Sequence, residues 1–190
     1  MQPERNISKK EKSRMKIMHA AKGLFEKYGI DDVTFTQIAK EADVCRTTVF
    51  NHFAGTRELL LAIFAQETED LKEYAESTGL VGMPMICALF DRLIEDTANY
   101  PTLSMRLITN AIMSHDAENP IAMIEDIVRC SLTAENPEDT ELKVVSITGA
   151  YYGLINHYHI NKLKFEAEIM KSEFRRIMSR ILNEEDKDYE

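Results

Sequence analysis

The stretch FTQIAKEADVCRTTVFNHFAGTRELLLAIF, residues 35–64, contains two short helical patterns joined by a tight turn. A capping box opens the first pattern, because Thr34 precedes it and Gln37 follows three residues later. The second pattern runs from about Arg46 to Phe53, and its apolar residues recur at helical spacing. Two short helices joined in this way allow the second helix to enter the major groove of DNA. The stretch therefore predicts a helix-turn-helix.

The outward positions of the second pattern carry mostly hydrogen-bonding side chains. The guanidinium of Arg46 suits O6 and N7 of guanine or a phosphate, and the amide of Asn51 suits adenine. The alternative is that these are the solvated polar residues of an ordinary surface helix, which the spacing alone does not exclude. The predicted DNA contacts are Thr34, Thr36, Gln37, Arg46, Thr47, Thr48, Phe50, Asn51, His52, Thr56 and Arg57.

Residues 14–64 resemble the N-terminal domain of the tetracycline-repressor (TetR) family. In that family T-x-x-x-I-A-x-x-A-G-V-S is followed by T-L-Y-x-x-F and then by a polar helix start before Leu-Leu. The matching positions are Ala20, Ala21, Leu24, Phe25, Gly29, Thr34, Ile38, Ala39, Ala42, Val44, Thr48, Val49, Phe50, Phe53, Glu58, Leu59 and Leu60. The resemblance implies a repressor that binds a near-palindromic double-stranded DNA operator as a homodimer and is released by a small-molecule effector.

Four positions depart from the family pattern. Asp43 replaces the turn glycine but can still adopt the left-handed conformation, and Cys45 replaces a serine cap with a poorer acceptor. Phe50 keeps the family's aromatic ring without the tyrosine hydroxyl. Thr56 stands where a lysine is usual, and we expect it to cap the following helix with Arg57 beside it. These changes bear on phosphate contacts rather than on the fold.

The composition predicts an all-α protein. Seven glycines, five prolines and 44% hydrophobic residues suit a helical chain with a buried core, and start and stop signals indicate nine helices. Pro84, Pro101, Pro120 and Pro137 each mark a helix start. The predicted domains are a DNA-binding domain at 1–58 with a flexible basic arm at 1–12 and the motif at about 33–52, a regulatory and dimerisation domain at 59–183, and an acidic tail at 184–190.

Charge is distributed unevenly along the chain. The net charge is -9, yet residues 1–60 contain 11 Lys or Arg and 8 Asp or Glu. The remaining residues therefore carry 12 basic and 24 acidic side chains. A basic head on an acidic body orients the encounter with a polyanion, although uneven scatter of surface charge is the alternative.

The C-terminal region gives only a helical pattern, so its site residues follow from the family architecture. The last two long helices, predicted at 137–161 and 166–182, are expected to pair with a second copy through Gly149, Ala150, Gly153, Phe174, Ile177 and Ile181. The alternative is that the glycines accommodate a neighbour within the chain. An effector, expected to be largely apolar, is predicted to contact Phe90, Met105, Ile108, Ile112, Met113, Tyr151, Tyr152 and His157, for which core packing is the alternative.

Other classes of function receive little support. No apolar run is long enough to cross a bilayer and no signal peptide begins the chain, so we expect a cytoplasmic protein. The three cysteines do not suggest a disulfide framework, and no nucleophile elbow or phosphate loop is present. His157 and His159 point apart on a helix, and His115 with Asp116 suits a solvated helix end better than a metal site. We therefore expect no cofactor, metal or catalysis; the alternative function is an all-α effector-binding or interaction protein with little DNA affinity.

Overall fold

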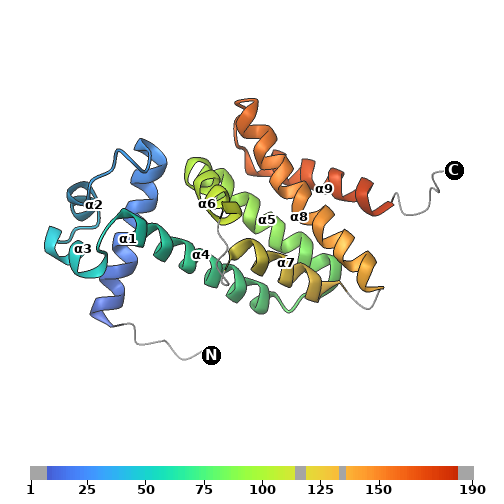
Figure 1. Cartoon of the computed structure of the whole chain (residues 1–190), viewed down its shortest axis with the longest axis horizontal. Helices are drawn as coiled ribbons and strands as arrows, with labels where there is room; N and C mark the ends of the chain where they lie inside the picture. Colours follow the sequence, from blue (N-terminus) through green and yellow to red (C-terminus); the bar gives the residue numbers. More distant parts are fainter. Residues whose placement is uncertain (1–7, 114–118, 133–135, 184–190) are drawn as a thin grey trace. The chain divides into compact units, whose positions relative to one another are not determined.

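The computed structural model describes residues 8–113, 119–132 and 136–183, and within these ranges the chain forms nine helices and no strand (Figure 1). This confirms the predicted all-α class. The helices are α1 (Lys9–Tyr28), α2 (Phe35–Glu41), α3 (Arg46–His52), α4 (Thr56–Thr78), α5 (Gly82–Asn99), α6 (Pro101–Met113), α7 (Pro120–Ser131), α8 (Pro137–Ile160) and α9 (Ala167–Asn183). Residues 1–7 of the predicted flexible arm and the predicted acidic tail at 184–190 lie outside the described residues. Residues 9–12 form the first turn of α1, so this part of the predicted arm is helical.

Packing divides the chain into two units, Met1–Glu67 and Thr68–Glu190. In the first unit, α1 contacts both α2 and α3, and α2 packs on α3. The division falls after Glu67 rather than at the predicted boundary after residue 58, because Leu59 and Ile63 of α4 are buried in the first unit. The buried apolar residues of this unit are Ile17, Met18, Ala20, Ala21, Phe25, Val33, Ile38, Ala39, Ala42, Val49, Phe53, Leu59 and Ile63.

Asparagine–proline pairs begin two helices of the second unit. Pro120 and Pro137 occupy first helical positions, where the missing N–H has no helical partner to lose. The side chains of Asn119 and Asn136 accept hydrogen bonds from the backbone N–H two residues onward, at 2.9 and 3.3 Å. Both predicted helix starts are confirmed.

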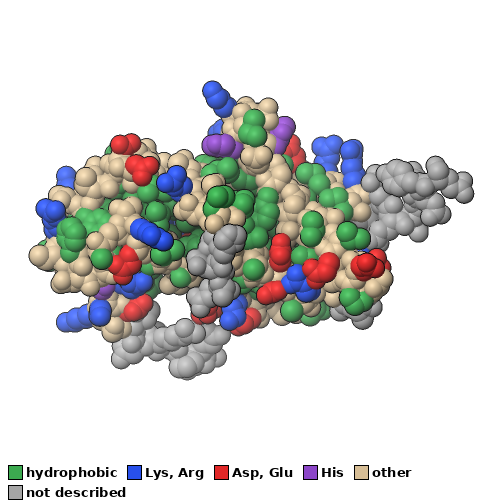
Figure 2. All heavy atoms as spheres, in the orientation of Figure 1, with side chains coloured by type: hydrophobic (Ala, Val, Ile, Leu, Met, Phe, Trp, Pro, Cys, Tyr) green, Lys and Arg blue, Asp and Glu red, His purple; other side chains and the backbone are tan. Residues whose placement is uncertain are grey.

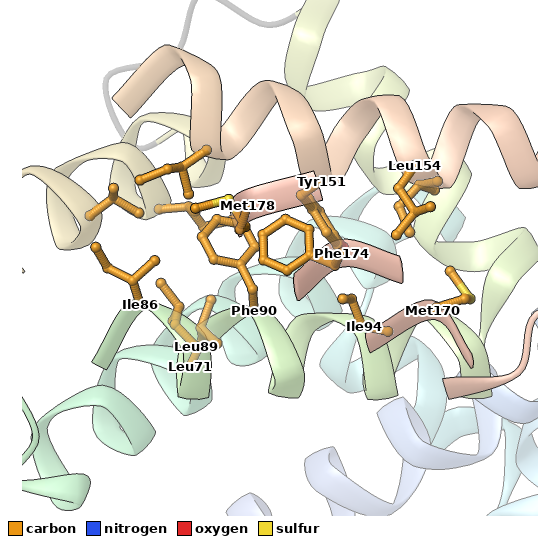
Figure 3. Packing of buried hydrophobic residues seen from close by; sticks show 14 of the residues in the cluster. Leu71, Ile86, Leu89, Phe90, Ile94, Tyr151, Leu154, Met170, Phe174 and Met178 are labelled. Carbon is orange, nitrogen blue, oxygen red and sulfur yellow. The ribbon is translucent and has the colours of Figure 1, made fainter. Parts of the chain in front are cut away.

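The core of the second unit is built around aromatic rings from three helices (Figure 3). The ring of Phe90 on α5 lies 4.9 Å from that of Phe174 on α9 and 5.6 Å from that of Tyr151 on α8, measured between centroids. Tyr151 also forms a buried 2.8 Å hydrogen bond with Thr97 of α5. Because these rings are large and specifically oriented, they fix the mutual packing of the three helices.

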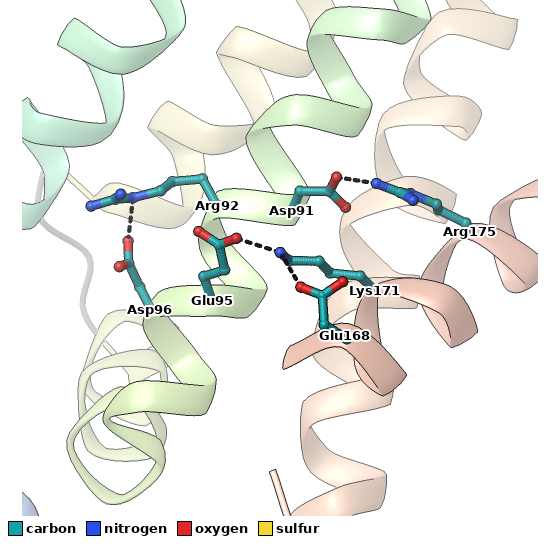
Figure 4. A network of polar contacts seen from close by, with 7 residues as sticks. All are labelled: Asp91, Arg92, Glu95, Asp96, Glu168, Lys171 and Arg175. Carbon is teal, nitrogen blue, oxygen red and sulfur yellow. Dashed lines mark hydrogen bonds and ion pairs between the residues drawn. The ribbon is translucent and has the colours of Figure 1, made fainter. Parts of the chain in front are cut away.

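Ion pairs flank this core between α5 and α9 (Figure 4). Arg175 pairs with Asp91, and Lys171 pairs with Glu95 and, at 3.0 Å, with Glu168 of its own helix. Lys171 is buried, whereas Arg175 is exposed. Exposed pairs contribute little to stability, but a buried ammonium group requires its carboxylate partners. Lys171 therefore needs Glu95 and Glu168 as partners where α9 packs on α5.

Candidate nucleic-acid interface

The capping box fixes the start of α2. Thr34 Oγ1 accepts a hydrogen bond from the backbone N–H of Gln37 at 3.3 Å, and Gln37 Oε1 accepts one from the backbone N–H of Thr34 at 2.8 Å. Both side chains are exposed. The predicted cap is confirmed, and it holds two of the predicted DNA contacts in defined positions at the N-terminus of α2.

The turn between α2 and α3 depends on one residue with positive φ. Asp43 has φ 53°, as expected for a residue in the position of the family's glycine. Its backbone N–H donates to the carbonyl of Lys40 at 3.3 Å, and that of Val44 donates to the carbonyl of Ala39 at 3.0 Å. These bonds close α2 and direct the chain into α3.

No side chain caps the N-terminus of α3, in agreement with the poorer acceptor expected at Cys45. The thiol lies instead 3.1 Å from the hydroxyl oxygen of Thr47 and 2.8 Å from that of Thr48. Hydrogen bonds from Thr47 and then Thr48 to the thiolate lower the pKa of Cys45 to about 7. A titratable thiol therefore stands at the entry to the second helix.

The start of α4 differs from the prediction. Thr56 is the first helical residue rather than a cap. The carboxylate of Glu58 accepts a 2.6 Å hydrogen bond from the backbone N–H of Ala54 instead, which satisfies a donor that precedes the helix. Thr56 and Arg57 are therefore first-turn residues of α4.

None of the eleven predicted DNA contacts is buried. Thr48, His52 and Thr56 are half-buried, and the other eight are exposed. The inward side of α3 is occupied by Val49, which is fully buried, and Phe53 is buried just after the helix. The apolar and polar faces of α3 are thus separated.

An aromatic contact joins the outward face of α3 to α2. The rings of Phe35 and Phe50 lie 5.0 Å apart and are tilted by 53°. The guanidinium carbon of Arg46 lies 5.3 Å from the centroid of the Phe50 ring. Sequence reasoning missed Phe35, although an aromatic residue directly after the Thr34 cap and off the inward face of α2 was a signal for it.

The end of α3 is linked to α1 by two contacts that sequence reasoning also missed. The hydroxyl of Ser13 lies 2.7 Å from Nε2 of His52, and the guanidinium of Arg14 lies 4.7 Å from the centroid of the Phe53 ring. Desolvation, followed by the positive charges of Arg14 and Lys10, lowers the pKa of His52. The imidazole therefore carries less positive charge near neutral pH than an ordinary histidine.

The predicted effector contacts are dispersed within the second unit. Phe90 and Tyr151 are buried, and Met105, Ile108 and Tyr152 pack half-buried against the same core. Ile112 and Met113 near the end of α6 are 61% and 76% exposed, and His157 is exposed on α8. The structure therefore brings five of the eight to one core and leaves three on the surface.

Three of the six predicted dimer contacts, Ala150, Gly153 and Ile177, line a groove between α8 and α9. The groove has a volume of about 470 Å³ and is lined by Ala150, Gly153, Leu154, His157, Glu173, Arg176, Ile177 and Arg180. Gly149 is exposed beside it, and Ile181 is half-buried on α9. Phe174 was predicted as a dimer contact, but it is 2% exposed because its ring packs on Phe90, so it belongs to the core and not to the surface.

The remaining expectations concern a metal site and a membrane-spanning segment. His115 and Asp116 lie outside the described residues. Within the described ranges, no three His, Cys, Asp or Glu side chains gather as a metal site would require. Nor does any helix there combine the length and apolar character that a membrane crossing needs.

Two short helices around a positive-φ turn, with the polar face of the second exposed, form a helix-turn-helix motif. The family model described as bacterial regulatory proteins, tetR family, matches residues 17–63. Residues 17–63 therefore form a domain of that family. The resemblance identified in the sequence is therefore confirmed.

Curated relatives match only part of the chain. The transcriptional repressor AcnR of Corynebacterium efficiens is 26% identical over 106 residues, which cover 56% of this chain and 53% of that protein. The transcriptional regulator SrpR of Pseudomonas putida is 39% identical over 62 residues, 33% of this chain and 29% of that protein. The chain thus spans about half the length of the first relative and less than a third of the second.

Solved structures share the fold over nearly the whole chain. A transcriptional regulator from Aquifex aeolicus VF5 aligns with a TM-score of 0.69 at 19% identity, covering 89% of this chain and 99% of that one. FadR of Thermus thermophilus, a TetR family repressor in complex with lauroyl-CoA, aligns with a TM-score of 0.57 at 22% identity, covering 93% and 96%. At these identities the likeness establishes the fold.

Proposed function

We propose that the chain is a sequence-specific transcriptional regulator, a repressor that leaves its operator when a small-molecule effector binds. The observation that carries this proposal is the exposed face of α3, on which Arg46 and Asn51 present groups suited to base edges. The excess of basic residues in the first 60 positions favours the approach of this unit to phosphate, despite the net charge of -9. Both signs of charge are interspersed on the face drawn in Figure 2.

The test is a binding titration of the full chain with the DNA upstream of its own gene, repeated at several salt concentrations. We expect specific binding whose affinity falls steeply as salt concentration rises. Contacts with DNA phosphates release bound counterions, and added salt makes that release less favourable. Arg46→Ala and Asn51→Ala should each weaken specific binding by about 1–3 kcal/mol. Arg106→Ala, which removes an exposed arginine from α6, is the matched control and should bind normally.

Circular dichroism should show all three variants folded, since each changed side chain is exposed. Unaltered footprints in Arg46→Ala and Asn51→Ala would remove these residues from the reading surface. Absence of specific binding by the wild type, even at low salt, would favour an effector-binding protein with little DNA affinity.

The chain is further proposed to act as a homodimer through α8 and α9. Leu142 and Val145 are 66% and 63% exposed, and they share one helical stripe with Gly149 and Gly153. Beyond its own helix backbone, a Cβ added at either glycine would meet no atom of the described residues within 4 Å. Open glycines beside exposed apolar residues suit close approach of a second copy, and two copies would present two reading helices to operator half-sites.

Gly153→Leu tests this interface. A Cβ at this position meets no described neighbour within 4 Å, and leucine favours a helix, so the substitution should keep the fold while separating the copies. Gly23→Leu is the matched control, because Gly23 is also an open glycine, on α1. Sedimentation should show a dimer for the wild type and the control and a monomer for Gly153→Leu. A dimeric Gly153→Leu would move the interface elsewhere.

The effector is proposed to bind in the second unit beside Tyr152. The hydroxyl oxygen of Tyr152 is buried without a hydrogen-bond partner among the described residues, and Met105 and Ile108 pack on the same core. An apolar compound with one polar atom would suit such surroundings. Because the FadR neighbour was solved with lauroyl-CoA, that compound is a suitable first probe. It should raise the unfolding temperature of the wild type more than that of Tyr152→Phe; no shift would exclude acyl thioesters of this length.

A further inference from the structure

Phe50 is an unusual residue on a face that otherwise carries polar groups. Its side chain is 47% exposed, and it stands one helical turn after Arg46 on α3. One exposed apolar side chain is ordinary on a protein surface. Phe50, however, contacts two specific partners, Phe35 and Arg46, which calls for an explanation.

The first contact fixes the ring. Phe35 of α2 lies 5.0 Å from Phe50 between centroids, and the tilt of 53° places the pair among favourable aromatic arrangements. Phe35 is itself half-buried and follows directly after the Thr34 cap. The Phe50 ring is thus held by the helix that precedes the turn, and not only by its own backbone.

The second contact is with the guanidinium of Arg46, whose Cζ lies 5.3 Å from the ring centroid. This distance is within the range of a cation–π interaction. A free arginine side chain samples many rotamers, and ordering it on binding has an entropic cost of up to about 2 kcal/mol. Stacking on a fixed ring removes part of that freedom before DNA arrives. The guanidinium keeps its N–H donors at its edge, where they remain available to a base or phosphate.

We propose that Phe50, supported by Phe35, is a positioning residue that presents Arg46 in one orientation and so sets the preference at the base pair that Arg46 reads. This inference rests on the proposed DNA-binding function. The ring acts through the arginine, not by direct contact with DNA. Loss of the family's tyrosine hydroxyl at this position is compatible with such a role, because the stacking needs only the ring.

The experiment uses the full chain and duplexes selected by the wild type from a random 20-base-pair pool. Preference at each position is measured for Arg46→Ala, Phe50→Leu, Phe50→Tyr and the double variant Arg46→Ala/Phe50→Leu. Tyr28→Leu is the matched control, since Tyr28 is 48% exposed and has Lys27 4.9 Å from its ring centroid, at the end of α1. Circular dichroism verifies that each variant is folded.

Arg46→Ala should reduce the preference at one base pair by roughly 5- to 150-fold. Phe50→Leu should reduce the preference at that same base pair by about 2- to 5-fold, the strength of an exposed cation–π contact. Phe50→Tyr should restore it, Phe50→Leu should add nothing in the Arg46→Ala background, and Tyr28→Leu should match the wild type.

Three results would overturn the proposal: an unchanged preference in Phe50→Leu, effects of Phe50→Leu and Arg46→Ala that multiply, or an altered base pair different from that of Arg46→Ala. The last two would indicate that Phe50 contacts DNA itself. If the wild type enriches no sequence from the pool, the proposed function fails first, and that outcome is distinct from the other three.

Discussion

Substitution of Asp43 tests whether the turn of the helix-turn-helix is held by a left-handed residue. At φ 53°, an L-amino acid ordinarily loses about 1–2 kcal/mol, and aspartate loses less because its short side chain can bond locally. Asp43→Val should therefore destabilise the first unit by the difference between the two costs, up to about 2 kcal/mol. Asp43→Gly relieves the strain but adds about 0.4–1 kcal/mol of freedom to the unfolded chain, so it should be as stable as the wild type or slightly more.

Scanning calorimetry of the full chain measures the effect. For a domain of this size each kcal/mol shifts the unfolding temperature by about 4–8 °C, which makes the loss in Asp43→Val readily detectable. Lys162 provides a parallel position, since it has φ 54° in the turn between α8 and α9. Lys162→Gly should stabilise the second unit instead. An Asp43→Val protein that unfolds at the wild-type temperature would refute the assignment of strain to this turn.

Two further predictions concern hydroxyl and thiol groups. Tyr151→Phe should destabilise the second unit by about 1 kcal/mol, because it leaves the buried hydroxyl of Thr97 without its hydrogen-bond partner. Tyr152→Phe should be neutral or stabilising in the absence of effector, because the Tyr152 hydroxyl has no partner among the described residues. Urea unfolding measures both changes, and equal losses of stability would contradict the assigned partners. Alkylation of Cys45 by iodoacetamide should accelerate as pH rises, with a midpoint near 7, because the thiolate reacts and its pKa is lowered to about 7. Burial raises the pKa of Cys87, so labelling of Cys87, followed separately by peptide mass spectrometry, should stay slow to higher pH than that of Cys45; a Cys45 midpoint near 9 would be inconsistent with the threonine contacts.

Local signals predicted much of the fold. The capping box at Thr34, the asparagine caps before Pro120 and Pro137, and the positive φ of Asp43 all depend on residues close in sequence. Such features can be inferred because a few neighbouring side chains satisfy the backbone groups involved. The start of α4 was predicted wrongly, because both Thr56 and Glu58 could accept a hydrogen bond at the helix start. Glu58, and not Thr56, accepts the bond, from the backbone N–H of Ala54.

Contacts between distant segments were beyond prediction. Phe35 contacts Phe50 and Ser13 contacts His52, and both contacts depend on how α1 and α2 pack against α3. In the second unit, Phe174 was predicted as a dimer contact and Ile112 as an effector contact. Phe174 is buried, whereas Ile112 is exposed. Helical periodicity indicates which residues share a stripe but not which stripe faces the core when several helices compete for it.

The division of α3 into two faces has a consequence for how such a protein changes its target. Seven residues are too few to form a stable helix in water, so α3 exists because Val49 and Phe53 are inserted into the unit beneath it. Folding makes no demand on Thr47 or Asn51, which project away from that anchor. New operator preferences can therefore arise by exchange of outward side chains alone, with the scaffold left intact.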